Sequence, residues 1–355
     1  MCIRDSFMVV SVVLAAALVG LVDPIVRLIS TPEEAVAGTT AYLTICFIGI
    51  PCITAYNVLA SIFRGMGDSR SPMYFIAAAC VVNIGLDFFF MGALRLGPAG
   101  AALGTTLSQA VSVLLALCVI LKHKSIRLSK SDFCPRKATM KDILSIGLPV
   151  AAQDGFIQVS FMLITIMANQ RGLTDAAAVG IVEKIISFLF LVPSSMLSTV
   201  SALGAQNIGA GKYDRTDDIL RYAIAIGVGF GAVMALLMQF IAPSMVRPFT
   251  SDEAVVLAGA AYIRSYIFDC LFAGIQFSFS GYFCAWGRSG LSFLHDTLSI
   301  LLVRVPGAWL ACRFFPQTLV PMGLAPACGS LFSSIVCVLL YRWMKRQNKP
   351  TGDKD

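Results

Sequence analysis

The sequence predicts an all-α membrane protein, from its apolar composition, its long apolar stretches and the uneven placement of its basic residues. The chain of 355 residues is 57% hydrophobic and only 13% charged, and its mean hydropathy is +0.80. A soluble domain ordinarily carries about 25% charged residues. The apolar stretches show no strand-length alternation, so helices are the spanning element that fits.

Apolar stretches of helical length recur from one end of the chain to the other. A bilayer core requires about 20 apolar residues per helix. Read at that length, the sequence gives ten predicted membrane-spanning helices, at roughly 7–29, 36–63, 72–92, 98–121, 141–168, 175–203, 217–243, 254–284, 290–314 and 321–344.

Basic residues lie mainly in every second gap between these spans, and the loop 122–141 is the richest of them. Cytoplasmic loops carry an excess of Lys and Arg. We therefore expect a multi-pass protein of the cell's inner (plasma) membrane, with loop 122–141 and the carboxyl terminus in the cytoplasm. The net charge of +7 follows from this distribution, and nucleic acid is not an expected partner.

The chain repeats itself at a fixed offset. Phe63 falls on Phe283 and Gly67 on Gly287, each 220 residues later. Matches of polar and glycine residues in loops, all at one offset, are hard to attribute to apolar composition. Because the offset moves the chain by an even number of spans, it predicts a parallel repeat, with two halves related by an axis along the membrane normal.

The repeat predicts more helices than the chain contains. The spans at 141–168 and 175–203 have no partner in the first half. We therefore expect twelve helices in two pseudo-symmetric six-helix lobes, with the first two helices missing from an N-terminally truncated chain. The predicted organisation is an incomplete N-terminal lobe at 1–121, a basic cytoplasmic inter-lobe loop at 122–140, a C-terminal lobe at 141–345 and a cytoplasmic tail at 346–355.

Several motifs carry a resemblance to a known family. They are FRGMGDSRSP at 63–72, NIGLD at 83–87, GPAGAALGT at 97–105, AQNIGAGKYDR at 205–215 and GLP at 147–149. Together they resemble the multidrug and toxin extrusion (MATE) family, over essentially all of residues 7–345. The resemblance implies two six-helix lobes facing a central cavity. It also implies a transporter, not an enzyme, that exports cationic drugs or toxic amphiphiles in exchange for protons or sodium by alternating access.

Asp87 is the strongest candidate for cation or proton coupling, because an ionisable residue inside a span is costly and is functional by default. Asn83 lies one helical turn earlier on the same face, and Thr105 lies in the next span. Hard oxygen ligands of this kind suit a small cation, and the resemblance implies a first-lobe cation site of this composition. The alternative is an Asp87 that lies near the headgroups and is merely solvated. Offset by 220 residues, the Asn–Asp pair falls on Val303 and Gly307, so the second half lacks it.

The second half contains four candidates for a substrate cavity or a secondary coupling site, namely Asp154, Gln153, Glu183 and Asp269. Asp154 and Gln153 follow Pro149, and proline frees a backbone carbonyl and kinks a helix. The alternative for Asp154 is a hydrogen bond within the helix bundle. Glu183 is a candidate to meet Asp154 across helices, and Lys184 is expected to serve structural pairing.

Asp269, His295 and Asp296 leave alternatives open. A cavity-facing Asp269 would attract a cationic substrate, and its alternative is a salt bridge with Arg264 or Arg304. His295 and Asp296 lie early in the next span. For these two, solvation at the interface and a role in proton transfer are equally compatible with the sequence.

Other classes of site fit the sequence less well. RGMGD at 64–68 lacks the Lys-Ser/Thr ending of a phosphate loop, so an ion gradient is expected to supply the energy. Two histidines and singly scattered cysteines predict neither a disulfide framework nor a zinc site. No cofactor is expected, and no metal other than transported sodium at Asp87, Asn83 and Thr105.

The nearest alternative function is a lipid-linked oligosaccharide or lipid flippase of the same superfamily, which would need a basic cavity for phosphate. A more distant one is an integral-membrane transferase, which would need clustered Asp or His near the membrane edge. The expected partners are small organic cations and membrane lipids, and the expected state is a monomer.

Overall fold

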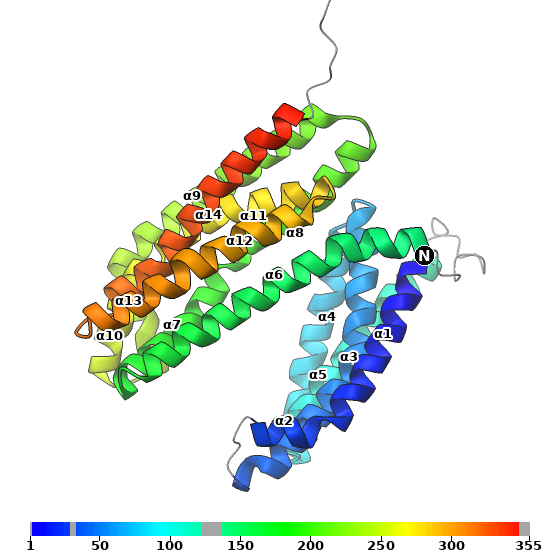
Figure 1. The fold of residues 1–355 in the computed structure, drawn as a ribbon. Coiled ribbons are helices and arrows are strands. Elements are labelled where there is room, and N and C mark those ends of the chain that lie inside the picture. The colour runs from blue at the N-terminus through cyan, green and yellow to red at the C-terminus, as the bar shows by residue number, and fades with distance from the viewer. Residues whose placement is uncertain (1, 29–32, 123–136, 348–355) are drawn as a thin grey trace, which may run out of the picture. The chain divides into compact units, whose positions relative to one another are not determined.

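A computed structural model describes residues 2–28, 33–122 and 137–347 of the chain (Figure 1). The described residues form helices joined by turns, with no strand among them. The chain divides into two compact units, Met1–Ile143 (unit 1) and Leu144–Asp355 (unit 2). Residues 123–136 and 348–355, which make up most of the predicted inter-lobe loop and tail, lie outside the described residues.

Unit 1 is a small bundle in which α3 packs against α1 and α5, and α4 packs against α5. Its core includes Phe63 and Phe75, whose rings meet edge to face with centroids 5.5 Å apart. The described elements of unit 1 are α1 (Cys2–Gly20), α2 (Val22–Leu28), α3 (Glu33–Gly65), α4 (Arg70–Asp87), the π-helix η1 (Phe88–Ala93) and α5 (Pro98–Lys122).

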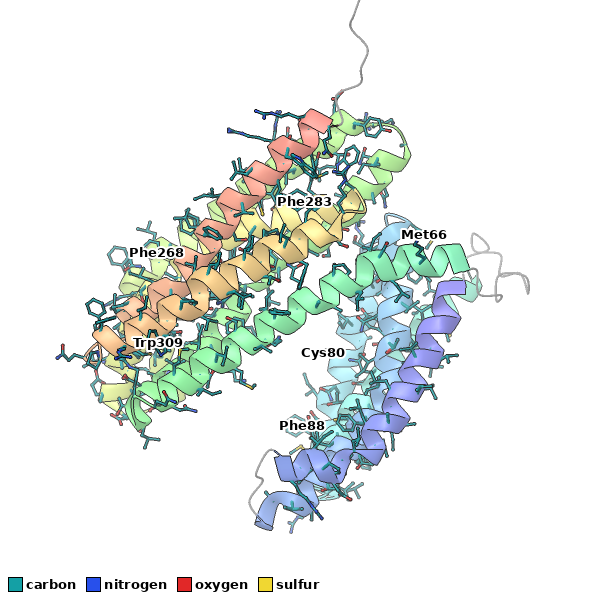
Figure 2. The ribbon with its side chains drawn as sticks, viewed as in Figure 1. Met66, Cys80, Phe88, Phe268, Phe283 and Trp309 are labelled. Atoms are coloured by element: carbon teal, nitrogen blue, oxygen red, sulfur yellow. The ribbon has the colours of Figure 1, made fainter. Side chains whose placement is uncertain are left out.

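Unit 2 is built around α11, which packs against α8, α9 and α14. It contains most of α6 (Lys137–Asn169), then α7 (Leu173–Leu189), α8 (Leu191–Gly209), α9 (Tyr213–Val246), the short 3-10 helix η3 (Arg247–Phe249), α10 (Glu253–Tyr266), α11 (Phe268–Ala285), α12 (Ser289–Ser299), the π-helix η4 (Ile300–Arg304), α13 (Val305–Phe314) and α14 (Val320–Gln347). Large side chains such as Phe88, Phe268 and Trp309 lie on the outer surface, whereas Phe283 is fully buried (Figure 2). This is the arrangement expected of helices surrounded by lipid.

Helices α9 and α11 touch backbone to backbone because glycine lies at their crossing. A Cβ added to Gly227 would lie 2.8 Å from Cα of Gly274, and one added to Gly231 would lie 2.5 Å from Cα of Leu271. Small residues permit such close approach between helices in membranes, where packing rather than the hydrophobic effect drives association.

Nine helices in the described part of the chain are long and apolar enough to cross a membrane. They correspond to nine of the ten predicted spans. The remaining span, predicted at 7–29, is divided into α1 and α2 at Leu21. Pro24 lies in the first turn of α2, where a missing backbone N–H costs no hydrogen bond. The predicted span at 175–203 is likewise two helices, and Pro193 lies in the first turn of the second, α8.

The predicted repeat is visible in the helix boundaries and turns. Helix α3 begins at Glu33, and 220 residues later α10 begins at Glu253. The turn after α3 contains Gly67 with φ +87°, and the turn after α11 contains Gly287 with φ +69°. In both turns a 6→1 backbone hydrogen bond closes the helix end, at 2.9 Å and 2.8 Å. The all-α, internally repeated membrane fold is therefore confirmed.

Candidate functional site

The structure brings Asn83 and Asp87 together on α4. The Asn83 Nδ2 donates to Asp87 Oδ1 at 3.5 Å, and both side chains are half-buried. They pack against Gly104 of α5, where an added Cβ would overlap Asp87 Oδ1 and approach Asn83 Nδ2 to 3.4 Å. The absence of a side chain at Gly104 therefore makes room for the pair.

Asp87 lies inside a predicted membrane-spanning helix rather than at its end. The span runs from Arg70 to Ala93, so Asp87 is roughly one and a half turns from the nearer end. The π-helix η1 begins at the next residue, and π-helical turns are frequent at functional sites.

Thr105, the third predicted ligand, does not join the Asn83–Asp87 pair in this arrangement. Its side chain is exposed, and its hydroxyl donates to the carbonyl of Ala101 in the same helix at 3.0 Å. The Asn83–Asp87 pair therefore contacts α5 at Gly104, and Thr105 is the next residue of α5.

Among the second-unit candidates, Gln153 enters the interior and Asp154 does not. Gln153 is 1% exposed, and its amide nitrogen donates to a carboxylate oxygen of Asp296. Its amide oxygen accepts a hydrogen bond from Ser292 at 2.7 Å. Asp154, the next residue on α6, is exposed.

Glu183 is half-buried in α7 and accepts a hydrogen bond from Thr165 of α6 at 3.0 Å. A contact with Asp154 was one possibility for Glu183; its partner on α6 is instead Thr165, about three turns further along the helix. Lys184 is exposed. Adjacent residues on a helix point in different directions, which separates the two charges.

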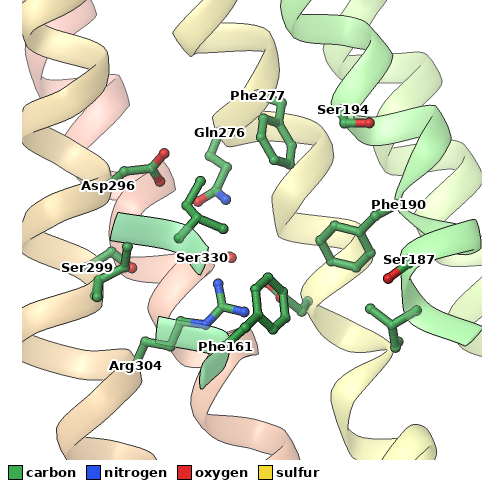
Figure 3. A pocket seen from close by; sticks show the side chains of 14 residues that line it. Phe161, Ser187, Phe190, Ser194, Gln276, Phe277, Asp296, Ser299, Arg304 and Ser330 are labelled. Atoms are coloured by element: carbon green, nitrogen blue, oxygen red, sulfur yellow. The ribbon is translucent and has the colours of Figure 1, made fainter. Parts of the chain in front are cut away.

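Unit 2 encloses a cavity of about 250 Å³ (Figure 3). Its polar lining comes from α7, α8, α11, α12, η4 and α14, and its aromatic lining from α6, α11 and the residue between α7 and α8. The polar residues are Ser187, Ser194, Asp269, Gln276, Asp296, Ser299, Arg304 and Ser330, and the aromatic ones are Phe161, Phe190 and Phe277.

Arg304 extends into this cavity from the π-helix η4. One of its guanidinium nitrogens donates to the hydroxyl of Tyr266 at 3.0 Å, and its Cζ lies 4.6 Å from the ring centroid of Phe161. The side chain is 8% exposed, and its Nε has no hydrogen-bond partner among the described residues. A cation in a membrane interior is held here by an aromatic face and a hydroxyl.

Asp269 lines the same cavity and is 1% exposed. Arg304, Ser330 and Asp296 are the polar groups that act on its charge. Among the described residues no ion pair within 4.0 Å joins it to a basic side chain, so the structure does not show the alternative of a salt bridge with Arg264 or Arg304. Arg264 instead is exposed and donates to the Gln239 carbonyl at 3.1 Å.

His295 and Asp296 are the functional candidates that the sequence did not resolve. The structure buries both, at 0% and 5% exposure, so solvation at a membrane surface does not apply to them. A periodic signal was present in the sequence, because one face of the helix carries polar residues at helical spacing, namely Ser289, Ser292, His295, Asp296 and Ser299.

A bundle of apolar helices with two repeated halves and charged groups inside it defines a multi-pass membrane transporter. A sequence model of the MatE family matches residues 7–89 and 149–310. The chain therefore belongs to the MatE family, whose members are MATE multidrug efflux transporters.

Individual relatives are similar over most of this chain. The probable multidrug resistance protein YpnP of Bacillus subtilis is 30% identical over 322 residues, which is 90% of this chain and 71% of YpnP. The multidrug export protein MepA of Staphylococcus aureus is 27% identical over 271 residues, covering 75% of this chain and 59% of MepA.

Solved structures share the fold. One is the outward-facing conformation of a multidrug resistance MATE family transporter of the MOP superfamily, with a TM-score of 0.91 at 21% identity, covering 98% of this chain and 78% of that one. Another is a MOP superfamily transporter from Pyrococcus furiosus, for which the reverse polarity of the binding pocket suggests a different function. Its TM-score is 0.87 at 19% identity, covering 97% of this chain and 77% of that one.

Proposed function

We propose that this protein exports small organic cations from the cell in exchange for protons or sodium, by alternating access. Family membership supports transport, and the names of YpnP and MepA point to drugs as the cargo of those relatives. The proposal places the protein in the plasma membrane, with loop 122–141 and the carboxyl terminus in the cytoplasm, as the distribution of basic residues indicates.

The observation that carries the coupling role is the Asn83–Asp87 pair against Gly104. A carboxylate inside a span is expensive to ionise without a partner. Its partner here is an amide 3.5 Å away that supplies no charge. A proton or a sodium ion at Asp87 removes that cost, and loss of the ion restores a negative charge that attracts a cationic substrate. When the coupling ion and the cationic substrate occupy the site in turn, the result is ion–substrate exchange.

The decisive comparison uses Asp87→Asn, which keeps the size of the side chain and removes its charge. The protein as its gene encodes it is expressed in a bacterium without its own drug pumps, and export of the fluorescent cation ethidium is followed. We expect export by the Asp87→Asn variant to fall at least tenfold, at equal amounts of protein in the membrane. Equal export by the two forms would contradict the proposal.

Two further variants separate the site from general damage. Gly104→Ala should also impair export, because its methyl group displaces the Asp87 carboxylate. Asp218→Asn changes a carboxylate that is 57% exposed on α9 and should leave export unchanged. Loss of export in the Asp218→Asn control as well would show that the assay does not report on the coupling site.

The charge inside unit 2 favours a cationic over an anionic cargo. Its cavity contains Asp269 and Asp296 against a single guanidinium, Arg304. A flippase for phosphate-bearing lipids would need the opposite balance, because a phosphate brings negative charge that basic groups must neutralise. The cavity therefore gives the flippase alternative no support.

The proposed orientation has its own test. In a variant that keeps Cys134 of loop 122–141 as its only cysteine, this thiol should be protected from a membrane-impermeant reagent in intact cells and should react once the membrane is opened. Labelling in intact cells would place loop 122–141 outside the cell and contradict the proposed orientation. It would not bear on the proposed exchange.

A further inference from the structure

Buried polar groups form a connected cluster at the centre of unit 2. The ring of His295 is bracketed by two serine hydroxyls, with Nε2 3.0 Å from Ser280 Oγ and Nδ1 2.7 Å from Ser333 Oγ. Asp296 Oδ1 lies 3.6 Å from the same Nδ1. The cluster joins α11, α12 and α14 at a depth where His295 is fully buried.

A second chain of hydrogen bonds reaches Asp296 from α6. Ser292 donates to the Gln153 amide oxygen at 2.7 Å, and the Gln153 amide nitrogen donates to Asp296 Oδ2. Asp296 also lines the cavity of unit 2 (Figure 3). The Asp296 carboxylate therefore lies at the cavity wall, between the His295 ring and the Gln153 amide.

The cavity has an excess of one negative charge when its carboxyl groups are ionised. Asp269 and Asp296 are balanced only by Arg304. Both oxygens of Asp269 and the Oε1 of Gln276 have no hydrogen-bond partner among the described residues. Uncompensated charge is costly in a membrane interior, so the site is incomplete until one positive charge arrives.

We propose that His295 and Asp296 together bind one proton, delivered through the cavity of unit 2, and that this site is separate from Asp87. The proton adds to a carboxylate oxygen of Asp296, beside the His295 ring, and no other bond is made or broken. The charges of the cavity lining are then balanced. The site lies in the other unit of the chain and goes beyond the exchange proposed for Asp87.

The surroundings favour a proton over a metal ion or an organic cation. Each ring nitrogen of His295 faces a hydroxyl that can donate or accept, so a proton can enter at one nitrogen and leave at the other without movement of heavy atoms. The Gln153 N–H already occupies one oxygen of Asp296, and a hydrogen-bond donor beside that oxygen disfavours a metal ion there.

Titration of the pair depends on the charged and titratable groups packed around it on every neighbouring element. On its own helix segment Arg304 of η4 acts on Asp296, and across the interfaces the groups are Asp154 of α6, Asp269 of α11 and Cys337 of α14. Glu183 of α7 and Tyr266 of α10 act on Arg304. Neutralising Asp154, Asp269, Glu183 or Arg304 should shift the pH at which the pair takes up its proton, while leaving the number of protons unchanged.

The test measures proton binding directly and needs no transport. Purified protein in lipid discs without sodium is brought from about pH 8 to about pH 5, the range in which histidine ordinarily changes charge, and the infrared difference spectrum is recorded. We expect a protonated-carboxyl band that disappears in Asp296→Asn. The Asn side chain retains an oxygen acceptor for Gln153, so the variant should fold.

Two matched variants make the result specific. His295→Gln should retain the carboxyl band but shift its frequency, because the imidazole no longer shares the proton, and this second variant covers the case in which Asp296→Asn fails to fold. Asp87→Asn should leave the Asp296 band in place, which separates this site from the proposed exchange site. A folded Asp296→Asn with the full band would overturn the proposal, and so would a band that sodium removes at constant pH.

Discussion

The helices that repeat in the two units surround different interiors. Phe75 lies in the core of unit 1, and His295 occupies the equivalent position of unit 2, one repeat of 220 residues later. The two serines that bracket His295 correspond to apolar residues of unit 1, namely Ala60 and Val113. The repeat therefore conserves backbone geometry, while the chemistry inside it differs from one half to the other.

The burial of equivalent helices differs as well. The most apolar window of the α10–α11 span is 61% buried within the structure, whereas that of the equivalent α3 is 22% buried. Helix α11 packs against α8, and an offset of 220 residues places the counterpart of α8 before residue 1 of the given sequence. In the structure His295 and Asp296 of unit 2 are buried, and the Asn83–Asp87 pair of unit 1 is half-buried.

The largest effect should come from adding one methyl group at the α9–α11 crossing. Gly227→Ala forces a Cβ to 2.8 Å from the Gly274 backbone, and neither backbone can retreat without separating the helices. We expect a loss of about 3 kcal/mol in the free energy of unfolding, measured by thermal or denaturant unfolding in detergent. Gly85→Ala in unit 1 is the matched control, since nothing lies within 4 Å of its Cβ, and it should stabilise α4 by up to about 1 kcal/mol. Similar losses of unfolding free energy in Gly227→Ala and Gly85→Ala would contradict the tighter packing inferred at the α9–α11 crossing.

A second test converts the interior of unit 2 into that of unit 1. His295→Phe alone removes the partner of two buried hydroxyls and should destabilise the protein by about 2 kcal/mol. Adding Ser280→Ala and Ser333→Val, the residues found at the equivalent positions of unit 1, removes both hydroxyls and should recover most of that loss. Unfolding of the single and triple variants measures the recovery. A triple variant that is less stable than the single one would show that the two interiors are not interchangeable.

One end of unit 2 has a hydrogen-bonded cluster around Asp217 that the equivalent residues of unit 1 cannot form. Asp217 of α9 accepts hydrogen bonds from Tyr282 at 3.0 Å and Tyr341 at 3.4 Å and pairs with Lys345. The two tyrosines correspond to Ile62 and Leu121 in unit 1.

Asp217→Asn should therefore cost about 1.5 kcal/mol of unfolding free energy, because a charge-assisted set of bonds is replaced by neutral ones. The neighbouring Asp218→Asn removes a surface ion pair with Arg221. The Asp218 side chain is 57% exposed and that of Arg221 is 79% exposed. It should change stability by less than about 0.5 kcal/mol. Raised salt should reduce the difference in unfolding free energy between the two variants only slightly. The Asp217 side chain is 14% exposed, so salt screens its interactions weakly.

The smallest effect should be the same in both units. Gly67→Ala and Gly287→Ala each place a side chain at a positive φ, in turns with matching hydrogen bonds. Each should cost about 1 kcal/mol, and the two losses should agree within the error of an unfolding measurement. A clear inequality would mean that the turns, although alike in backbone, are supported differently by their surroundings.

Much of the fold followed from periodicity and composition. The helix class, nine of the span positions and the 220-residue repeat were all predictable, because a bilayer permits few alternatives to an apolar helix of fixed length. Breaks inside spans were less predictable. The interruption at Ile267 between α10 and α11 follows no proline or glycine in the sequence.

The candidate residues divide along the same line. Asn83 and Asp87 were placed together correctly, since a spacing of one helical turn fixes their common face whatever surrounds the helix. Gln153 and Asp154 were treated as equals, yet one is buried and the other exposed. Which of two neighbours points inward depends on the rotation of α6 against α12, and that rotation comes from packing between segments more than a hundred residues apart.

The sequence by itself determined the membrane class, the helices, the repeat and the one-turn pairing of Asn83 with Asp87, because each of these depends on local geometry and on the solvent around a helix. Only the tertiary structure decided that Gly104 makes room for Asp87, that Asp269 faces a cavity without an ion-pair partner within reach in the described chain, and that His295 and Asp296 are enclosed with Gln153. These features depend on which helix faces lie against each other. Contacts between distant segments determine which faces pack together, and the spacing of residues along the sequence does not specify those contacts.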